Sequence, residues 1–518
     1  MSAPDGREAH LDLRLVPAAL TSWGITAAGI LWSIGGVVVM FSAAVATASA
    51  TAWWGSRRRR SRDGVRITAA GVAAIALTAL SFGIAVQLRV DQMRHHPLVD
   101  SYGTVTAVIV TPSETPRSLG GGRVMFRGSL EAVDADEMSG RVVVFASVAG
   151  FAELTAGQPA AFRARIARPN RRDLTIAVLS ATGEPTLGEA APIQRAGQAV
   201  RSAFAAAARS ALPTDEAAML PALVLGDTSM LSNEATAQFR ASGLTHLTAV
   251  SGANVTIVCG AVLLTAALVG PRIAVGAAAV ALVAFVVVVQ PSASVLRAAV
   301  MAAITLLALV THRRRQAIPA LSVAVIALMI AAPELAVDVG FALSVSATAA
   351  LVVIAPAWSR GLVARGWPKP LADAVSVAVA AQLVTAPLVA AISGTFSVVA
   401  VAANLAAAAV IAPITVLGCA AAALSVLWPA GAGLLIRFTG PELWWLLNVA
   451  RWAAGIPGAS VPVPAGVPGA LTVAAATIAM VALSRWCRRS LRTRGAEERL
   501  RTRGAEERLS ARHDTIGR

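Results

Sequence analysis

A polar stretch at 243–254 lies inside an apolar part of the chain and holds the side chains best suited to chemistry. Ser251 and Asn254 are three residues apart, hence neighbours on a helix, and His246 lies toward one end. Polar residues in a membrane segment usually face the bundle interior or a water-filled path. Two interpretations stay open: the stretch, with Gly252, lines a pore or substrate path, or it makes interhelical hydrogen bonds. A serine–histidine hydrolase is a weaker third interpretation, because the stretch has no GxSxG elbow and no nearby acidic partner.

Two charged side chains, Arg297 and Asp338, lie a few residues inside apolar segments. Burying either one in a membrane costs about 2.5–3.5 kcal/mol on insertion scales. Both segments are expected to run from outside to inside, so the two side chains share a depth. They either reach the nearby membrane interface or form an ion pair near the outer mouth of the bundle, beside His246. Gln382 and Asn404 are the other deep polar positions.

The sequence lacks the residues that several kinds of site would require. The three cysteines are far apart, and the six histidines form no HxH or HExxH pair, so we expect no metal and no cofactor. The chain has no GxxxxGK[ST] loop, and its one lysine, Lys369, follows a proline. A P-loop motor is therefore excluded. Whatever the protein moves must be driven by a gradient or by a partner.

The elements that position these residues follow from composition. Of the 518 residues 56% are hydrophobic and 14% charged, and mean hydropathy is +0.68. A soluble globular domain has roughly 45–50% apolar and about 25% charged residues, so the chain is predicted to be a polytopic α-helical membrane protein. A span needs about 20 residues, and about 12 are expected. They cover 15–32, 37–54, 67–88, 244–268, 271–290, 293–311, 317–333, 336–357, 371–392, 396–411, 413–428 and 467–485.

The net charge of +16 is concentrated in short basic loops. These loops, at 57–66, 312–316 and 359–370, are expected to stay in the cytoplasm. With this span count both termini are cytoplasmic and residues 101–243 are extracytoplasmic. The tail repeats RTRGAEERL in tandem from 492 to 509, which predicts a solvated, disordered segment, or alternatively one that binds anionic membrane lipid.

Residues 101–185 have a different pattern, with alternating strand-like runs separated by turn signals. About five strands in about 80 residues suit a small closed or half-closed all-β barrel. After it, 193–212 is predicted to be an alanine-rich helix with Arg195, Arg201 and Arg209 toward water. A second soluble helical stretch, 214–243, is expected to lead back to the membrane.

The run LVLGD at 223–227, with FRASGLTHL at 239–247 and VSG at 250–252, resembles the ComEC-type competence protein family. LRAA at 296–299 and GFALS at 340–344 also match, and the resemblance covers nearly all of 15–485. It implies an inner-membrane channel that imports single-stranded DNA in natural transformation, with an OB-like external domain. It also adds Asp227 to the candidate path residues. Many members carry histidine where this chain has Asn254.

The resemblance further implies partners. We expect single-stranded DNA as the substrate, a membrane DNA receptor and a separate cytoplasmic ATPase. Many members end in a metallo-β-lactamase-like domain, but this sequence has no HxHxDH, so such a nuclease is expected to be absent or separately encoded. Residues 101–185 contain nine arginines and eight acids, so DNA binding there would depend on stacking as well as charge. The candidates are the arginines Arg127, Arg163 and Arg165 and, for stacking, Tyr102, Phe126, Phe145 and Phe151; alternatively the aromatic side chains form the core of the barrel.

The predicted organisation has five parts: N-terminal membrane helices at 1–100, an OB-like extracytoplasmic domain at 101–188, a soluble helical connector at 189–243, a channel domain at 244–486 and a charged cytoplasmic tail at 487–518. The expected function is a DNA-import channel and not an enzyme. A small-solute permease or exporter is the alternative, and a membrane-anchored hydrolase ranks lower. The barrel favours the first, because small-solute permeases rarely need an external oligonucleotide-binding module.

Overall fold

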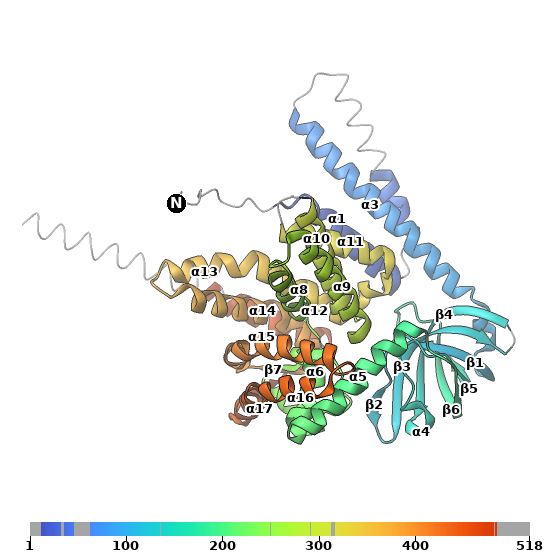
Figure 1. Cartoon of the computed structure of the whole chain (residues 1–518). Helices are drawn as coiled ribbons and strands as arrows, with labels where there is room; N and C mark the ends of the chain where they lie inside the picture. Colours follow the sequence, from blue (N-terminus) through green and yellow to red (C-terminus); the bar gives the residue numbers. More distant parts are fainter. Residues whose placement is uncertain are drawn as a thin grey trace, which may run out of the picture.

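The computed structural model describes residues 12–32, 36–45, 63–134, 136–248, 250–290, 292–311, 316–480 and 482–483, without the side chains of 63–70. A helical bundle and a β-barrel make up this part of the chain (Figure 1). The predictions for 46–62, for the basic residues at 312–315 and for the tail at 487–518 lie outside the described residues.

Apolar helices form the bundle. The longer ones are α1 (Val16–Trp32), α3 (Asp63–Arg94), α8 (Gly252–Ala266), α9 (Pro271–Val289), α10 (Ala293–Val310), α11 (Ala317–Ala331), α12 (Val339–Ala349), α13 (Ala355–Val363), α14 (Lys369–Ser393), α15 (Ala400–Leu424), α16 (Pro429–Phe438) and α17 (Gly440–Gly455). A π-helical turn, Ala350–Ile354, joins α12 to α13, so these two helices continue into one another.

Among the described residues, six segments are long and apolar enough to cross a membrane. They are Gly71–Ser101, Pro271–Val289, Ala293–Val310, Val339–Val363, Lys369–Ser393 and Ala400–Leu424. Five shorter apolar helices accompany them: Val16–Trp32, Gly36–Val45, Gly252–Ala266, Ala317–Ala331 and Val467–Met480. The length and composition of these helices fit a membrane protein.

Three predicted spans differ from the structure. The spans expected at 396–411 and 413–428 are one helix, α15, with Pro413 inside it. Helices in membranes tolerate an internal proline, because neighbouring groups satisfy the freed carbonyl. The span expected from 244 is helical only from Gly252, where α8 begins, and a short 3₁₀ turn, Thr245–Leu247, precedes it.

The barrel is built from β1 (Val105–Pro112), β3 (Arg123–Val133), β4 (Asp136–Ser147), β5 (Ala160–Ala167) and β6 (Ala177–Leu187), with β2 (Arg117–Gly120) as an extra edge strand on β3. Its strand order is β1-β5-β6-β4-β3, and β3 pairs back with β1 to close it. All pairings are antiparallel except β4 with β6. Alternate residues point inward, and Phe126, Phe151 and Phe162 stack in the core.

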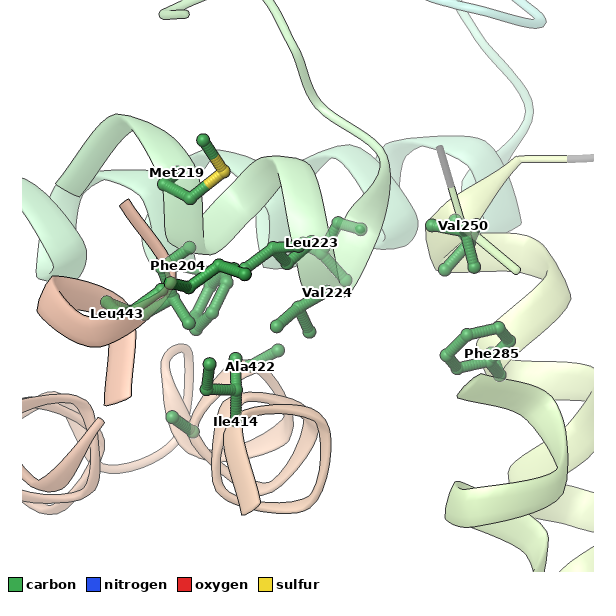
Figure 2. Close-up of a cluster of buried hydrophobic side chains, with 14 of the residues drawn as sticks. Phe204, Met219, Leu223, Val224, Val250, Phe285, Ile414, Ala422 and Leu443 are labelled. Carbon is green, nitrogen blue, oxygen red and sulfur yellow. The ribbon is translucent and has the colours of Figure 1, made fainter. Parts of the chain in front are cut away.

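The helical core is centred on α6 (Thr214–Leu225), whose residues 217–225 are all buried. The second stretch expected to be soluble therefore enters the bundle. In Figure 2, Val224 lies toward Ala422 and Ile414 of α15. This close approach depends on Gly418, because a Cβ there would lie 2.4 Å from Cγ2 of Val224.

Among the described residues, polar contacts at three places attach the barrel to the bundle. Arg141 of β4 forms an ion pair with Glu334, in the turn between α11 and α12. Nη1 of Arg172 donates to the carbonyl of Leu31 at the end of α1, at 2.7 Å. The backbone N and Oγ1 of Thr115, in the loop after β1, donate to Oε1 of Gln290, between α9 and α10. From the barrel, α5 (Pro192–Ala211) leads back to the bundle (Figure 1).

Candidate functional site

The segment LVLGD ends α6 in a buried ion pair. Gly226 adopts a left-handed conformation that ends the helix, and Asp227 follows it. Asp227 Oδ2 lies 3.7 Å from Nη2 of Arg201 on α5, and Nη1 of Arg201 donates to the carbonyls of Leu225 and Val288, both at 3.1 Å. Arg201 thus connects α5, α6 and α9. In this position Asp227 is a structural partner of Arg201.

The expectation that Arg201 faces water was wrong, since only 7% of it is exposed. Burial lowers the pKa of Arg201, and the negative charge of Asp227 opposes that shift. A signal was present in the sequence, because Arg201 shares a stripe with Gly197, Phe204 and Ala208 at helical spacing, and all four are buried.

Asn254 and Ser251 make an interhelical hydrogen bond network. Nδ2 of Asn254 donates to the carbonyl of Leu223 on α6 at 2.9 Å, and Oγ of Ser251 donates to Oδ1 of Asn254 at 3.3 Å. Only 5% of Asn254 is exposed. The amide of Asn254 is therefore engaged with α6. Of the two interpretations of this stretch, interhelical hydrogen bonding is the one that explains the contacts of Asn254.

His246, Gln382 and Asn404 belong to a second region, around β7 (Thr395–Ser397). His246 is exposed in the 3₁₀ turn after Gly243, and a Cβ on Gly243 would lie 2.5 Å from that of Ala400. Nε2 of Gln382 donates to the carbonyl of Ser397 at 3.5 Å. Asn404 is half-buried on α15, one turn beyond Ala400, and its side chain makes no hydrogen bond to other described residues.

Arg297 is buried where α8, α10 and α12 meet, with 5% of it exposed. Its Nε donates to Oγ of Ser344 on α12 at 2.8 Å, and its Nη1 to Sδ of Met301 at 3.2 Å. Its Nη2 lies 2.9 Å from the place that a Cβ on Gly252 would take, at the first residue of α8. Serine and methionine are neutral, so neither balances the charge of the guanidinium.

The predicted ion pair of Arg297 with Asp338 does not form. Oδ1 of Asp338 instead accepts the backbone N–H of Phe341 at 2.8 Å and caps the N-terminus of α12. An aspartate at this position satisfies one of the free N–H groups of a helix start and interacts favourably with the helix dipole. The sequence contained a local signal for this helix cap, because Asp338 directly precedes the helical run that begins at Val339.

Three of the barrel candidates cannot stack on a base without rearrangement. Phe126 and Phe151 are fully buried in the core, so their predicted role in DNA binding was wrong and the alternative of core residues holds. The hydroxyl of Tyr102 donates to the carbonyl of Ile176 at 2.7 Å, and Arg168 covers its ring. Arg163 and Arg165 are exposed on β5, and Arg127 is half-buried on β3.

Phe145 was among the predicted stacking candidates, but the arginine that lies over its ring was not predicted. Arg123 of β3 lies over the half-buried ring of Phe145 on β4, with its guanidinium carbon 6.0 Å from the ring centre. Alternation along both strands, which places these residues outside, was the signal that could have found it. Within the described residues, no group of three or more His, Cys, Asp or Glu side chains is arranged to hold a metal ion.

Two hollows of the described bundle lie away from these residues. One, of about 340 Å³, is lined by the start of α6 and by α17, including Asp215, Glu216, Trp444 and Arg451. Another, of about 560 Å³, is lined by apolar residues of α5 and α9. Neither contains a residue predicted to line a path.

Comparison with known proteins identifies the helical part. A model of the family described as "Competence protein" matches residues 223–489, which is more than half of the chain. The match begins in α6, and it includes the buried cluster around Arg297, Gly252 and Asn254. Neither the curated proteins nor the solved structures include a match. The resemblance seen in the motifs is thus confirmed: the chain belongs to the ComEC-type competence family of DNA-uptake proteins.

Proposed function

We propose that this protein is a channel through which single-stranded DNA crosses the cell membrane during natural transformation. The family match over 223–489 is the observation that carries the proposal. Support comes from the apolar helices, which suit a membrane location, and from the buried polar side chains of Asn254 and Arg297, which lie within the matched residues. In this proposal the protein conducts its substrate and catalyses no covalent step.

The barrel is proposed to be an OB-like module that receives the strand outside the membrane. Its support is a closed ring of five strands, the size and class of barrel used by oligonucleotide-binding domains. In such domains the second and third strands form the binding face, and here these are β3 and β4, which carry the exposed Arg123 and Phe145 pair. Binding is expected to be weak and independent of sequence, because arginines and acids nearly balance.

The proposed orientation places residues 101–243 outside and both termini in the cytoplasm. Arg141 of the barrel pairs with Glu334 in the turn before α12, so this end of α12 lies on the side of the barrel. The continuous helix then runs to Val363, and the basic segment with Arg360, Arg365 and Lys369 lies at its far end. Short arginine-rich loops favour the cytoplasm.

The proposal needs partners, because no nucleotide-binding loop is present to power transport. A membrane receptor that delivers DNA, a cytoplasmic ATPase that pulls the strand and a separately encoded nuclease would complete the system. Lipid surrounds the apolar helices. The exposed Trp444, Trp445 and Trp452 of α17 suit a membrane interface, where tryptophan is enriched.

A deletion strain tests the function. We expect loss of transformation by marked chromosomal DNA, with unchanged growth on defined media and restoration by a plasmid copy. The full-length protein in liposomes adds a direct assay, in which labelled oligothymidine but not glucose or amino acids enters. Normal transformation in the deletion strain would refute the proposal, and solute flux without oligothymidine entry would favour a permease.

A further inference from the structure

Arg297 is a buried cation without an anion. Among the described residues its partners are Oγ of Ser344 and Sδ of Met301, and no carboxylate lies within ion-pairing distance. A lone charge inside a membrane bundle is costly, and such residues mark substrate or ion pathways. An arginine in this position, with 95% of its surface covered, calls for a negative partner that is not among the described residues.

The free part of the guanidinium faces the start of a helix. Nη2 has no hydrogen-bond partner among the described residues, and it lies against Gly252, the first residue of the 15-residue helix α8. The side chain of Ser251 does not cap this helix, because its hydroxyl donates to Asn254. The N–H groups of a helix N-terminus and an arginine both attract phosphate.

The surroundings hold the guanidinium in this direction. Ser344 accepts from Nε, and Oγ of Ser294 lies 3.3 Å from Oγ of Ser344, which makes a small polar cluster between α10 and α12. Gly252 leaves room for Nη2, because any larger residue would place its Cβ in contact with that atom. Ser251 and Gly252 are half-buried and Ala253 is exposed, so the helix start is accessible.

We propose that Arg297 and the N-terminus of α8 form a phosphodiester-binding site inside the bundle, which holds one phosphate of the strand in transit. The inference rests on the proposed function and adds a specific contact to it. Arg297 supplies the charge and the Nη2 donor, and the first backbone N–H groups of α8 supply the others. Ser344 is a positioning residue, since it contacts Nε and leaves Nη2 free.

Binding of oligothymidine to the full-length protein in nanodiscs tests the site. We expect Arg297→Gln to weaken binding roughly tenfold to a hundredfold, the usual range for a lost hydrogen bond to a charged group. The dependence of log affinity on log salt should also become shallower by about 0.7, the contribution of one phosphate contact on a single strand. A purely structural arginine would not change this slope.

Gly252→Ala is the second variant, because it keeps the charge but displaces Nη2 from the helix start. We expect this variant also to bind oligothymidine more weakly. If thermal unfolding shows that Arg297→Gln does not fold, the affinity of Gly252→Ala tests the site instead. Arg209→Gln, at an exposed arginine of α5, is the matched control and should leave affinity and slope unchanged.

Three outcomes would overturn the inference. Folded Arg297→Gln protein with wild-type affinity and slope would do so while leaving the channel proposal intact. An effect seen only in nanodiscs that contain phosphatidylglycerol, and absent with zwitterionic lipid, would assign the site to lipid headgroups. Wild-type protein that neither binds oligothymidine nor admits it to liposomes would remove the proposed function together with the site.

Discussion

At the scale of single residues, the buried and half-buried polar side chains of the helical part divide into two kinds. Arg201, Asp227 and Asn254 are engaged with partners in this chain and connect neighbouring helices. Arg297 has no countercharge among the described residues and faces a helix start. Two arginines that are buried to a similar extent, Arg201 and Arg297, therefore differ in role: the first serves packing and the second offers binding capacity, and their partners distinguish the two roles.

The buried pair of Arg201 and Asp227 leads to a prediction about stability. Asp227→Ala should lower the stability of the folded protein by about 3 kcal/mol, because it leaves a buried guanidinium without its countercharge. Thermal unfolding in detergent measures this. The double variant Arg201→Met with Asp227→Ala should recover much of the loss. Equal losses in the single and double variants would show that the ion pair is not what stabilises this corner.

Individual residues also show how much of the candidate site could be predicted from the sequence. The motifs correctly indicated the family, but the pairing of Arg297 with Asp338 was inferred from equal depth alone. Depth along a helix does not fix the direction of a side chain, and Asp338 had a stronger local alternative as the cap of α12. Arg201 was misjudged because its charge outweighed the small and apolar stripe that it shares.

At the scale of elements, close helix packing depends on small residues, as expected where lipid removes the hydrophobic drive between helices. The contact between α6 and α15 is an example, since Gly418 faces Val224. The strand pattern of the barrel was readable from alternation, and most helices from their apolar runs. The sequence did not predict that α15 is a single helix. A proline such as Pro413 usually ends a helix, and the packing that supports it here cannot be inferred from the sequence.

Gly418→Ala should destabilise the bundle by about 1–3 kcal/mol through overpacking against Val224. Val224→Ala in the same chain should relieve most of this cost. The yield and melting temperature of purified protein measure both effects. Gly260→Ala on α8, where a Cβ would meet nothing within 4 Å, is the control and should be neutral. A neutral Gly418→Ala would mean that α6 and α15 pack less closely than described.

At the scale of the whole molecule, the barrel and the far end of α13 mark opposite sides (Figure 1). Three separate attachments, from β4 and from two barrel loops, hold the barrel against the bundle. One of these, through Thr115, contacts Gln290, in the connection that leads into the helix of Arg297. The loop after β1 therefore lies beside the start of α10, the helix that carries Arg297.

Orientation gives the prediction at this scale. The three native cysteines are first replaced. In this background, Ser113→Cys on the barrel should react with a membrane-impermeant maleimide on intact cells, whereas Arg365→Cys should react only after permeabilisation. Both positions are exposed, so accessibility within the protein does not limit either reaction. Labelling of Arg365→Cys but not of Ser113→Cys on intact cells would reverse the proposed topology.

The burial of α6 has a consequence for synthesis. Every residue from 217 to 225 is covered, and much of that cover comes from α15 and α17, which begin at Ala400 and Gly440. Roughly 175 residues separate α6 from α15, and at about 5–20 residues per second the ribosome needs roughly 10–35 s to supply them. During that interval the part of α6 that α15 and α17 later cover lacks its packing partners, so membrane insertion must shield this apolar surface until the C-terminal helices emerge.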